Sequence, residues 1–264
     1  MLVDVPGGHL SCRDEGAGPP VLLLHGGALD HRMWDDQAAA LSATFRVVAP
    51  DFRGHGASST PRSSFRHCDD IAQLVRTLGV GPVAVVGLSM GATTALDVAL
   101  EYPELVSRVV VVGAGTSEPH FHDPWLLGVL ETQAKAARAG DVAGWIEAAL
   151  AFAAGPSRQL SEVDADVVRR LREMIVATLT THVASGVPLL PTAPKKTWER
   201  LVDVQIPVLC LGGELDSSDH LAMARRVAET VPNGSWDVVP GTAHYPNMEC
   251  PAPFTARLRA FLSA

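Results

Sequence analysis

Short apolar runs alternate with longer amphipathic segments along the first half of the chain. The runs are rich in Val and Leu and are too short to be helices, which is typical of strands buried on both faces of a sheet. The pattern predicts strands at residues 21–24, 45–49, 83–86 and 108–112, with helices at residues 32–42, 65–78 and 90–101 between them. Because such alternation produces a parallel sheet with helices on both faces, we assign the chain to the α/β class. Residues 2–5 and 9–13 flank a Pro-Gly-Gly turn and predict a hairpin leading into the sheet.

The strand signals disappear in the middle of the chain and then return. The helical pattern predicts helices at residues 125–139, 142–154, 165–185 and 194–201. Strands follow at residues 207–211 and 236–239, with helices at residues 220–230 and 254–262. We therefore predict an eight-stranded, mostly parallel core (residues 1–117 and 202–264) with an inserted helical cap (residues 118–201). A cap of this kind usually shapes a substrate pocket, whereas the alternative is a separate helical domain.

Composition narrows the function classes. The chain has 264 residues, 47% of them hydrophobic, and a net charge of −8, which excludes a disordered chain and argues against a nucleic-acid partner. No apolar stretch approaches the ~18 residues of a membrane helix, and the first residues lack the basic and apolar regions of a signal peptide. The four cysteines, Cys12, Cys68, Cys210 and Cys250, are scattered. We expect reduced thiols in a cytoplasmic protein, with no metal and no membrane partner.

The segment 83–91 carries the clearest chemical signal. An apolar strand runs into Gly-Leu-Ser-Met-Gly, and a helix follows. A nucleophile on a sharp strand-to-helix turn needs small neighbours, and Gly87 and Gly91 meet that need on either side of Ser89. The helix that follows directs the positive end of its dipole toward the turn, where negative charge would develop.

Two further residues have the chemistry that a serine nucleophile requires. His244 follows the last predicted strand and is a candidate base. Asp216 follows strand 207–211 and is a candidate for the acid that orients the imidazole. All three residues follow strands, so we expect them at the carboxyl edge of the sheet. Asp219 is the rival acid, but its position before helix 220–230 favours an N-cap role. Glu214 is expected to face solvent.

Other residues are candidates for binding the substrate. The N–H groups of Gly27, in a small-residue turn after strand 21–24, and of Met90 would form an oxyanion hole. Large aromatic side chains could contact substrate, although core packing is the competing interpretation for each: Trp34, Trp125, Trp145, Trp198 and Tyr245. His120 and His122 lack further ligands at a metal-binding spacing. One of the arginines at 169, 170 and 172 could bind a substrate carboxylate, although a solvated face is the simpler interpretation.

Five segments of the chain resemble motifs of the α/β-hydrolase superfamily. Residues 25–27 resemble its oxyanion turn, residues 51–58 its Asp-x-Arg-Gly-x-Gly-x-Ser segment, and residues 87–91 its nucleophile elbow. Residues 213–216 resemble its acid turn, and residues 241–251 its histidine loop. They follow the order of this family over nearly the whole chain. The resemblance implies an α/β-hydrolase fold with Ser89, Asp216 and His244 as the triad, and bracing roles for Asp51, Arg53 and His55.

The nucleophile restricts the chemistry that this resemblance implies. Members that open epoxides or remove halides resemble one another in carrying Asp at the elbow, whereas this chain has Ser89. Ring-cleavage carbon–carbon hydrolases often have Trp after the histidine, and here Tyr245 follows. The chain looks most like small bacterial esterases and enol-lactonases. We therefore predict a cofactor-free serine hydrolase, monomeric or homodimeric, acting on a small carboxylic ester or lactone. The alternatives are a slow-turnover ligand receptor or signalling protein, a perhydrolase, and a carbon–carbon bond hydrolase.

Overall fold

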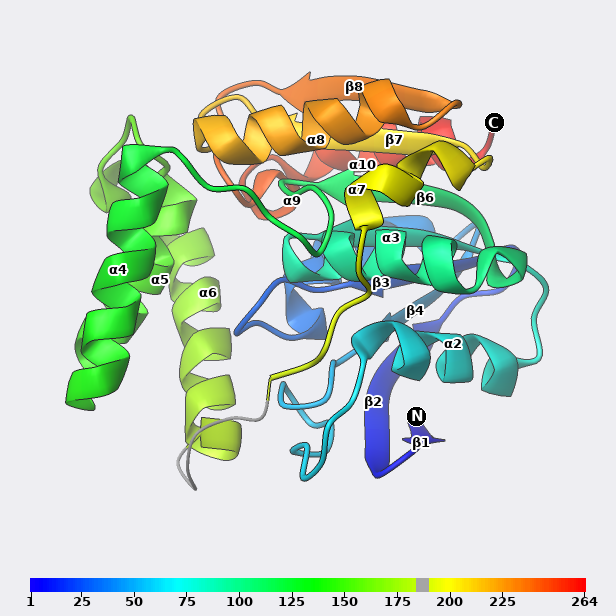
Figure 1. Cartoon of the computed structure of the whole chain (residues 1–264), viewed down its shortest axis with the longest axis horizontal. Helices are drawn as coiled ribbons and strands as arrows, with labels where there is room; N and C mark the ends of the chain where they lie inside the picture. Colours follow the sequence, from blue (N-terminus) through cyan, green and yellow to red (C-terminus); the bar gives the residue numbers. More distant parts are fainter. Residues whose placement is uncertain (184–189) are drawn as a thin grey trace.

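The computed structural model describes residues 1–183 and 190–264, and its centre is a mixed sheet of eight strands (Figure 1). The strand order is β1-β2-β4-β3-β5-β6-β7-β8. The pairs β1·β2 and β2·β4 are antiparallel, and every later pair is parallel. The bounds are β1 Leu2–Val5, β2 Gly8–Glu15, β3 Pro20–Leu24, β4 Arg46–Pro50, β5 Val83–Leu88, β6 Val106–Val112, β7 Val208–Gly213 and β8 Gly234–Val239. The predicted eight-stranded, mostly parallel sheet is confirmed.

Alternating side chains on each strand supply two separate apolar cores. On β3, Leu22 and Leu24 pack into one core, and Val21 and Leu23 pack into the other. All four side chains are essentially inaccessible, which explains why the strand is apolar at every position. One core includes residues of α2 (His67–Leu78), α3 (Met90–Glu101) and α8 (Ser218–Thr230). The other includes residues of α1 (Asp35–Leu41) and α10 (Pro251–Leu262).

Three helices of the predicted cap segment stand together beside one end of the sheet (Figure 1). They are α4 (Pro124–Ala139), α5 (Val142–Ala154) and α6 (Ala165–Thr178). A π-helical turn, Leu179–Val183, continues α6, and the last two residues of the predicted helix 165–185 lie outside the described residues. A short helix, α7 (Thr197–Arg200), packs against the α3 side of the core although it belongs to the predicted cap segment.

Two predicted helices begin differently from the pattern. The segment predicted as helix 32–42 starts with a 3-10 turn, His31–Trp34, that Asp30 caps through Arg32 N–H, and α1 follows it. The helix predicted from residue 65 begins at His67, because Arg66 is still extended. Within the described residues, no helix is both long and apolar enough to span a membrane.

Candidate active site

The turn between β5 and α3 presents Ser89 in a strained conformation. Its φ of 53° and ψ of −115° lie in a region that non-glycine residues rarely adopt. The Ser89 N–H donates to Val112 O at 2.9 Å, which ties the turn to the end of β6. A Cβ on Gly87 would overlap the Gly91 carbonyl, and a Cβ on Gly91 would overlap the Leu24 carbonyl. Both glycines are therefore required for this turn, as the spacing predicts.

The candidate acid and base meet at the carboxyl edge of the sheet. His244 follows β8 and Asp216 follows β7, and His244 Nδ1 lies 2.8 Å from Asp216 Oδ2. Burial lowers the pKa of His244, and the Asp216 charge only partly offsets this, so the ring is neutral and able to accept a proton. Burial alone would raise the pKa of Asp216, but the neighbouring imidazoles outweigh it and hold that pKa below its usual value.

Ser89 and His244 line the same cavity, and in the described part of the chain no hydrogen bond joins the Ser89 hydroxyl to the imidazole. Contacts between a nucleophile and its base often become short only when substrate is bound. The arrangement can therefore supply a nucleophile, a neutral base and an acid that orients the base.

A second histidine, which the sequence reasoning did not identify, occupies the other side of the acid. His220 Nδ1 lies 2.9 Å from Asp216 Oδ1, and the ring stacks on His244 with centroids 4.4 Å apart. The signal was the four-residue spacing from Asp216, which brings the first turn of α8 back over the acid.

The rival acid, Asp219, has a structural role but not the predicted one. Ser217 is the N-cap of α8, and its side chain accepts from the His220 N–H. Asp219 Oδ2 instead accepts from the backbone N–H groups of His122 and Asp123, at 2.6 and 2.7 Å. The N-cap prediction for Asp219 is wrong, because the helix begins at Ser218, two residues earlier than predicted, and the Asp219 side chain instead contacts the backbone just before α4.

The glycine turn after β3 is braced by two imidazoles. His25 is fully buried, with Nδ1 2.8 Å from Gly26 O and Nε2 accepting from Phe52 N–H at 2.9 Å. Ala28, at a φ of 59°, donates its N–H to His55 Nε2 at 3.2 Å. These contacts hold the turn beside the nucleophile elbow.

The two predicted oxyanion donors belong to different elements. Gly27 lines the cavity together with Ser89. Met90 is the first residue of α3, so its N–H has no acceptor within the helix and is available for a ligand. Their role as oxyanion donors stays a prediction that rests on this placement.

The segment 51–58 braces the loops around the site. Asp51 Oδ1 accepts from His31 N–H and lies 2.7 Å from His31 Nδ1, and its Oδ2 accepts from Ala57 N–H. Arg53 makes two 2.7 Å hydrogen bonds to Asp70, and both side chains are buried. These contacts match the expected bracing roles of Asp51, Arg53 and His55.

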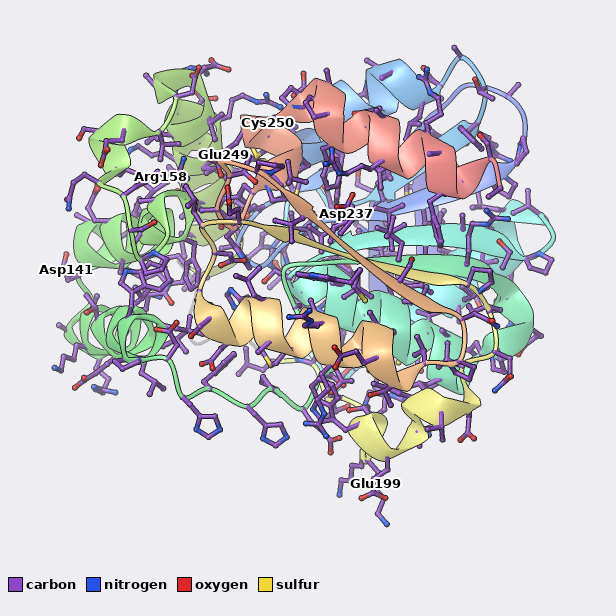
Figure 2. All side chains as sticks on the ribbon, turned by 90° about the horizontal axis from the view of Figure 1, so that it is seen from above. Asp141, Arg158, Glu199, Asp237, Glu249 and Cys250 are labelled. Atoms are coloured by element: carbon purple, nitrogen blue, oxygen red, sulfur yellow. The ribbon has the colours of Figure 1, made fainter. Side chains whose placement is uncertain are left out.

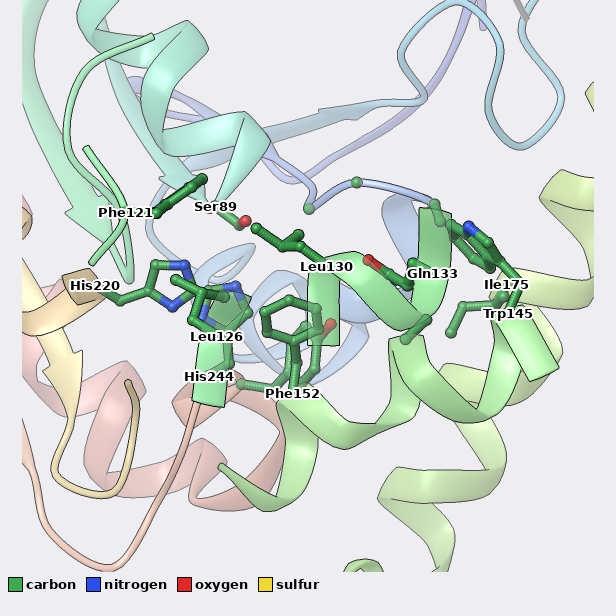
Figure 3. Close-up of a pocket in the computed structure, with 15 residues that line it drawn as sticks. Ser89, Phe121, Leu126, Leu130, Gln133, Trp145, Phe152, Ile175, His220 and His244 are labelled. Atoms are coloured by element: carbon green, nitrogen blue, oxygen red, sulfur yellow. The ribbon is translucent and has the colours of Figure 1, made fainter. Parts of the chain in front are cut away.

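The cavity beside Ser89 measures about 330 Å³ and is predominantly apolar (Figure 3). Its lining includes no Lys, Arg, Asp or Glu among the described residues. The lining residues are Gly26, Gly27, Ala28, Ser89, Phe121, Leu126, Leu130, Gln133, Trp145, Ala149, Phe152, Ile175, His220, His244 and Tyr245. A second cavity of about 660 Å³ shares Ala28 and Trp145 with the first, and Met90 lines it.

The aromatic candidates divide between the cavity and the core. Trp145 and Tyr245 line the cavity. Trp125 packs edge-on against Phe152, which itself lines the cavity, but Trp125 is not part of the lining.

Two of the predicted substrate contacts lie in packed regions instead. Trp34 is completely buried and lies 6.2 Å, centroid to centroid, from Phe254 of α10. Trp198 donates its indole N–H to Glu118 O at 2.7 Å and lies beneath the Arg226 guanidinium. Neither lines either cavity, because packing against the core competes for the same apolar surface that a substrate would use.

An ion pair joins the cap to the histidine loop (Figure 2). Arg158, which follows α5, lies 2.7 Å from Glu249 Oε2, and Glu249 Oε1 accepts from Ala243 N–H at 2.8 Å. Arg158 also donates to the carbonyl of Ala153. Glu249 thereby links Ala243, the residue before His244, to Arg158 of the predicted cap segment.

Two groups of side chains in the described residues have ligand atoms close enough for a metal ion: Asp216, His220 and His244, and Asp30, His31 and Asp51. Each group contains an Asp–His hydrogen bond, which accounts for the proximity without an ion. The expected absence of a metal stays a prediction.

Comparisons with known proteins agree with this fold. The alpha/beta hydrolase fold family matches residues 19–251. A 2-(acetamidomethylene)succinate hydrolase of Mesorhizobium japonicum is 29% identical over 99% of this chain and 94% of its own. The putative carbamate hydrolase RutD of a Caulobacter species is 30% identical over 98% of this chain and 94% of its own. The esterase RhEst1 of a Rhodococcus species superposes with a TM-score of 0.81 at 26% identity, covering 100% of this chain and 98% of its own.

The chain therefore belongs to the α/β-hydrolase fold family. The three relatives are hydrolases by name, and hydrolysis is the class of activity that membership and these relatives support.

Proposed function

We propose that this protein is a serine hydrolase that cleaves small, uncharged carboxylic esters or lactones through an acyl-enzyme on Ser89. One observation carries the proposal. A strained strand-to-helix turn presents Ser89 to a predominantly apolar cavity, which it shares with a neutral histidine held by a buried carboxylate.

The chemistry follows from this arrangement. His244 takes the Ser89 proton as the hydroxyl oxygen attacks the ester carbonyl, and Asp216 stabilises the imidazolium that forms. The N–H groups of Gly27 and Met90 stabilise the oxyanion of the tetrahedral intermediate. His244 then gives its proton to the departing alkoxide. A water molecule releases the acid from Ser89 through the same steps in reverse order.

The lining of the cavity favours a neutral substrate. A carboxylate on the substrate would need a cationic partner in so apolar a space, and no Lys or Arg lines the cavity in the described residues. The cap arginines that could have met such a charge are paired elsewhere: Arg169 with Asp166 and Glu173, Arg170 with Asp36, and Arg172 with Glu147. We therefore propose that its substrates are uncharged, unlike the succinate derivative in the name of the Mesorhizobium relative.

Hydrolysis of p-nitrophenyl acetate and butyrate at neutral pH tests the proposal. We expect multiple turnovers in the wild type, a covalent acyl adduct by mass spectrometry, and loss of both in Ser89→Ala. Asp216→Asn should lower kcat by roughly 10⁴-fold, the effect of losing the orienting acid. Asp219→Asn is the matched control and should retain activity.

Activity that persists in Ser89→Ala would refute the proposal. A single stoichiometric burst would instead favour the slow-turnover receptor. Full activity in Asp216→Asn with loss in Asp219→Asn would reassign the acid.

A further inference from the structure

Two imidazoles share the catalytic carboxylate. Asp216 contacts His244 through Oδ2 at 2.8 Å and His220 through Oδ1 at 2.9 Å. The rings stack with an interplanar angle of 28°, and Figure 3 shows both at the Ser89 end of the cavity. His220 is 6% exposed and lines the cavity. The mechanism proposed above uses His244 as the base and assigns no role to His220.

A purely structural role does not explain His220. Asp216 Oδ1 already accepts a hydrogen bond from Ser217 N–H at 2.7 Å, so the oxygen has a partner without the imidazole. The start of α8 is capped by Ser217 and needs no side chain from His220. An apolar residue of similar size would fill the space without burying a polar ring.

The hydrogen bond to Asp216 fixes which nitrogen of His220 is free. A carboxylate oxygen accepts, so Nδ1 carries the hydrogen and Nε2 remains. Among the described residues no protein group forms a hydrogen bond with this Nε2, and it is not among the fully buried side-chain atoms that lack a partner, so the atom keeps some accessible surface.

This arrangement of hydrogens decides what Nε2 can do. An imidazole with its hydrogen on Nδ1 has Nε2 as a hydrogen-bond acceptor. Because His220 lines the cavity, a substrate group there can donate to this nitrogen.

We propose that His220 determines substrate specificity: its Nε2 accepts a hydrogen bond from a hydroxyl or amide N–H that the substrate carries beside the scissile carbonyl. The substrates favoured by this site are 2-hydroxy and 2-acylamino esters or lactones. The inference rests on the proposed function and narrows its substrate class.

Matched pairs of esters test the inference. Phenyl 2-hydroxypropanoate is compared with phenyl 2-methoxypropanoate, and the phenyl ester of N-acetylalanine with its N-methyl analogue. In each second member a methyl group replaces the donor hydrogen. We expect the wild type to favour the donor member at least roughly tenfold in kcat/KM, the size of one net hydrogen bond. The ratio is taken within one protein, so a partly folded variant does not distort it.

Two substitutions at the same position separate recognition from support of Asp216. In His220→Asn the amide can donate to Asp216 as Nδ1 does but has no group at the Nε2 position, and the ratio should fall to about one. In His220→Gln the longer side chain can place an acceptor near the Nε2 position, and part of the preference should return. His122→Gln is the control, because His122 is exposed and does not line the cavity, and it should keep the wild-type ratio.

The outcomes distinguish this inference from the proposed function. Phenyl propanoate, which has no donor, tests the proposed function alone. If neither it nor the paired esters are hydrolysed in a Ser89-dependent way, both the proposed function and this inference are overturned. Hydrolysis with equal kcat/KM for the members of each pair in the wild type overturns the inference alone. Retention of the wild-type ratio in His220→Asn also overturns it.

Discussion

Replacing Asp97 with Asn removes a charge that the folded protein buries. Asp97 lies on α3, the helix that follows the nucleophile, and is 6% exposed. Its Oδ1 accepts from the Ser117 hydroxyl at 2.8 Å, on the chain that leaves β6 for the cap. Burial raises the pKa of Asp97 to about 7, although Ser117 and two arginines partly oppose the rise. Asparagine has the same shape and keeps a carbonyl oxygen for Ser117.

The sign of the effect follows from the raised pKa. The folded protein holds the proton more tightly than the unfolded chain, in which an Asp has its ordinary pKa of 3.8. The contribution of this carboxyl to stability is therefore fully present below that ordinary pKa, and it is lost progressively as the pH rises from there through about 7. At 1.36 kcal/mol per pKa unit, the free energy of unfolding lost by pH 8 is roughly 4 kcal/mol. Asp97→Asn does not titrate and loses none of it.

Urea unfolding of wild type and Asp97→Asn between pH 4 and pH 8.5 measures this difference. Other groups titrate equally in both proteins, so the difference in unfolding free energy isolates Asp97. We expect it to grow by about 1.4 kcal/mol per pH unit in favour of Asn up to neutral pH and then to level off. In a Ser117→Ala background, the same difference should keep growing to a higher pH. The substitution removes a hydrogen bond that favours the Asp97 carboxylate and so raises the pKa of Asp97 further. A difference that is flat with pH would refute the reasoning.

Three further substitutions test the site and its surroundings. Gly87→Ala places a Cβ against the Gly91 carbonyl, so we expect loss of covalent labelling by a fluorophosphonate probe; full labelling would contradict the need for glycine there. Trp145→Ala opens the 330 Å³ cavity toward the 660 Å³ one, and the kcat/KM ratio of p-nitrophenyl octanoate to acetate should rise about tenfold, from roughly 1.4 kcal/mol of new apolar contact. An unchanged ratio would show that Trp145 does not separate the cavities. Arg158→Met leaves Glu249 buried without its ion-pair partner and should lower the unfolding free energy by about 2–4 kcal/mol in chemical denaturation, a loss that Arg158→Lys should partly restore.

The sheet was predictable because its signals are contiguous in the sequence. A strand such as β5 is apolar at every position, and the small residues that must follow it lie within the next few positions. The order Ser89, Asp216, His244 could also be predicted from the sequence, since each residue lies in the loop or turn that follows a parallel strand. The structure places Asp216 in contact with His244, and His244 lines the same cavity as Ser89.

The lining of the cavity was much less predictable, because it depends on which side of a helix packs inward. Trp34 and Trp145 are equally apolar, yet one packs beneath α10 and the other lines both cavities. His220 was missed for a related reason. Its role comes from the direction in which the first turn of α8 leaves the acid, and its neighbours in sequence do not indicate that direction.

The strand between the nucleophile and the acid imposes a requirement that the motifs do not include. β6 lies between β5 and β7, so the nucleophile that follows β5 must meet the acid and base, which follow β7 and β8, across its end. Gly113 follows β6 at a φ of +59°, where a Cβ would lie 3.1 Å from His244 Nδ1 and 3.3 Å from Asp216 Oδ2. A residue with a side chain at this position would have a strained backbone, and its Cβ would crowd the hydrogen-bonded atoms that orient the base. The proposed triad of this chain therefore depends on a glycine that has no part in the proposed chemistry, at the end of a strand that carries none of the three candidate residues.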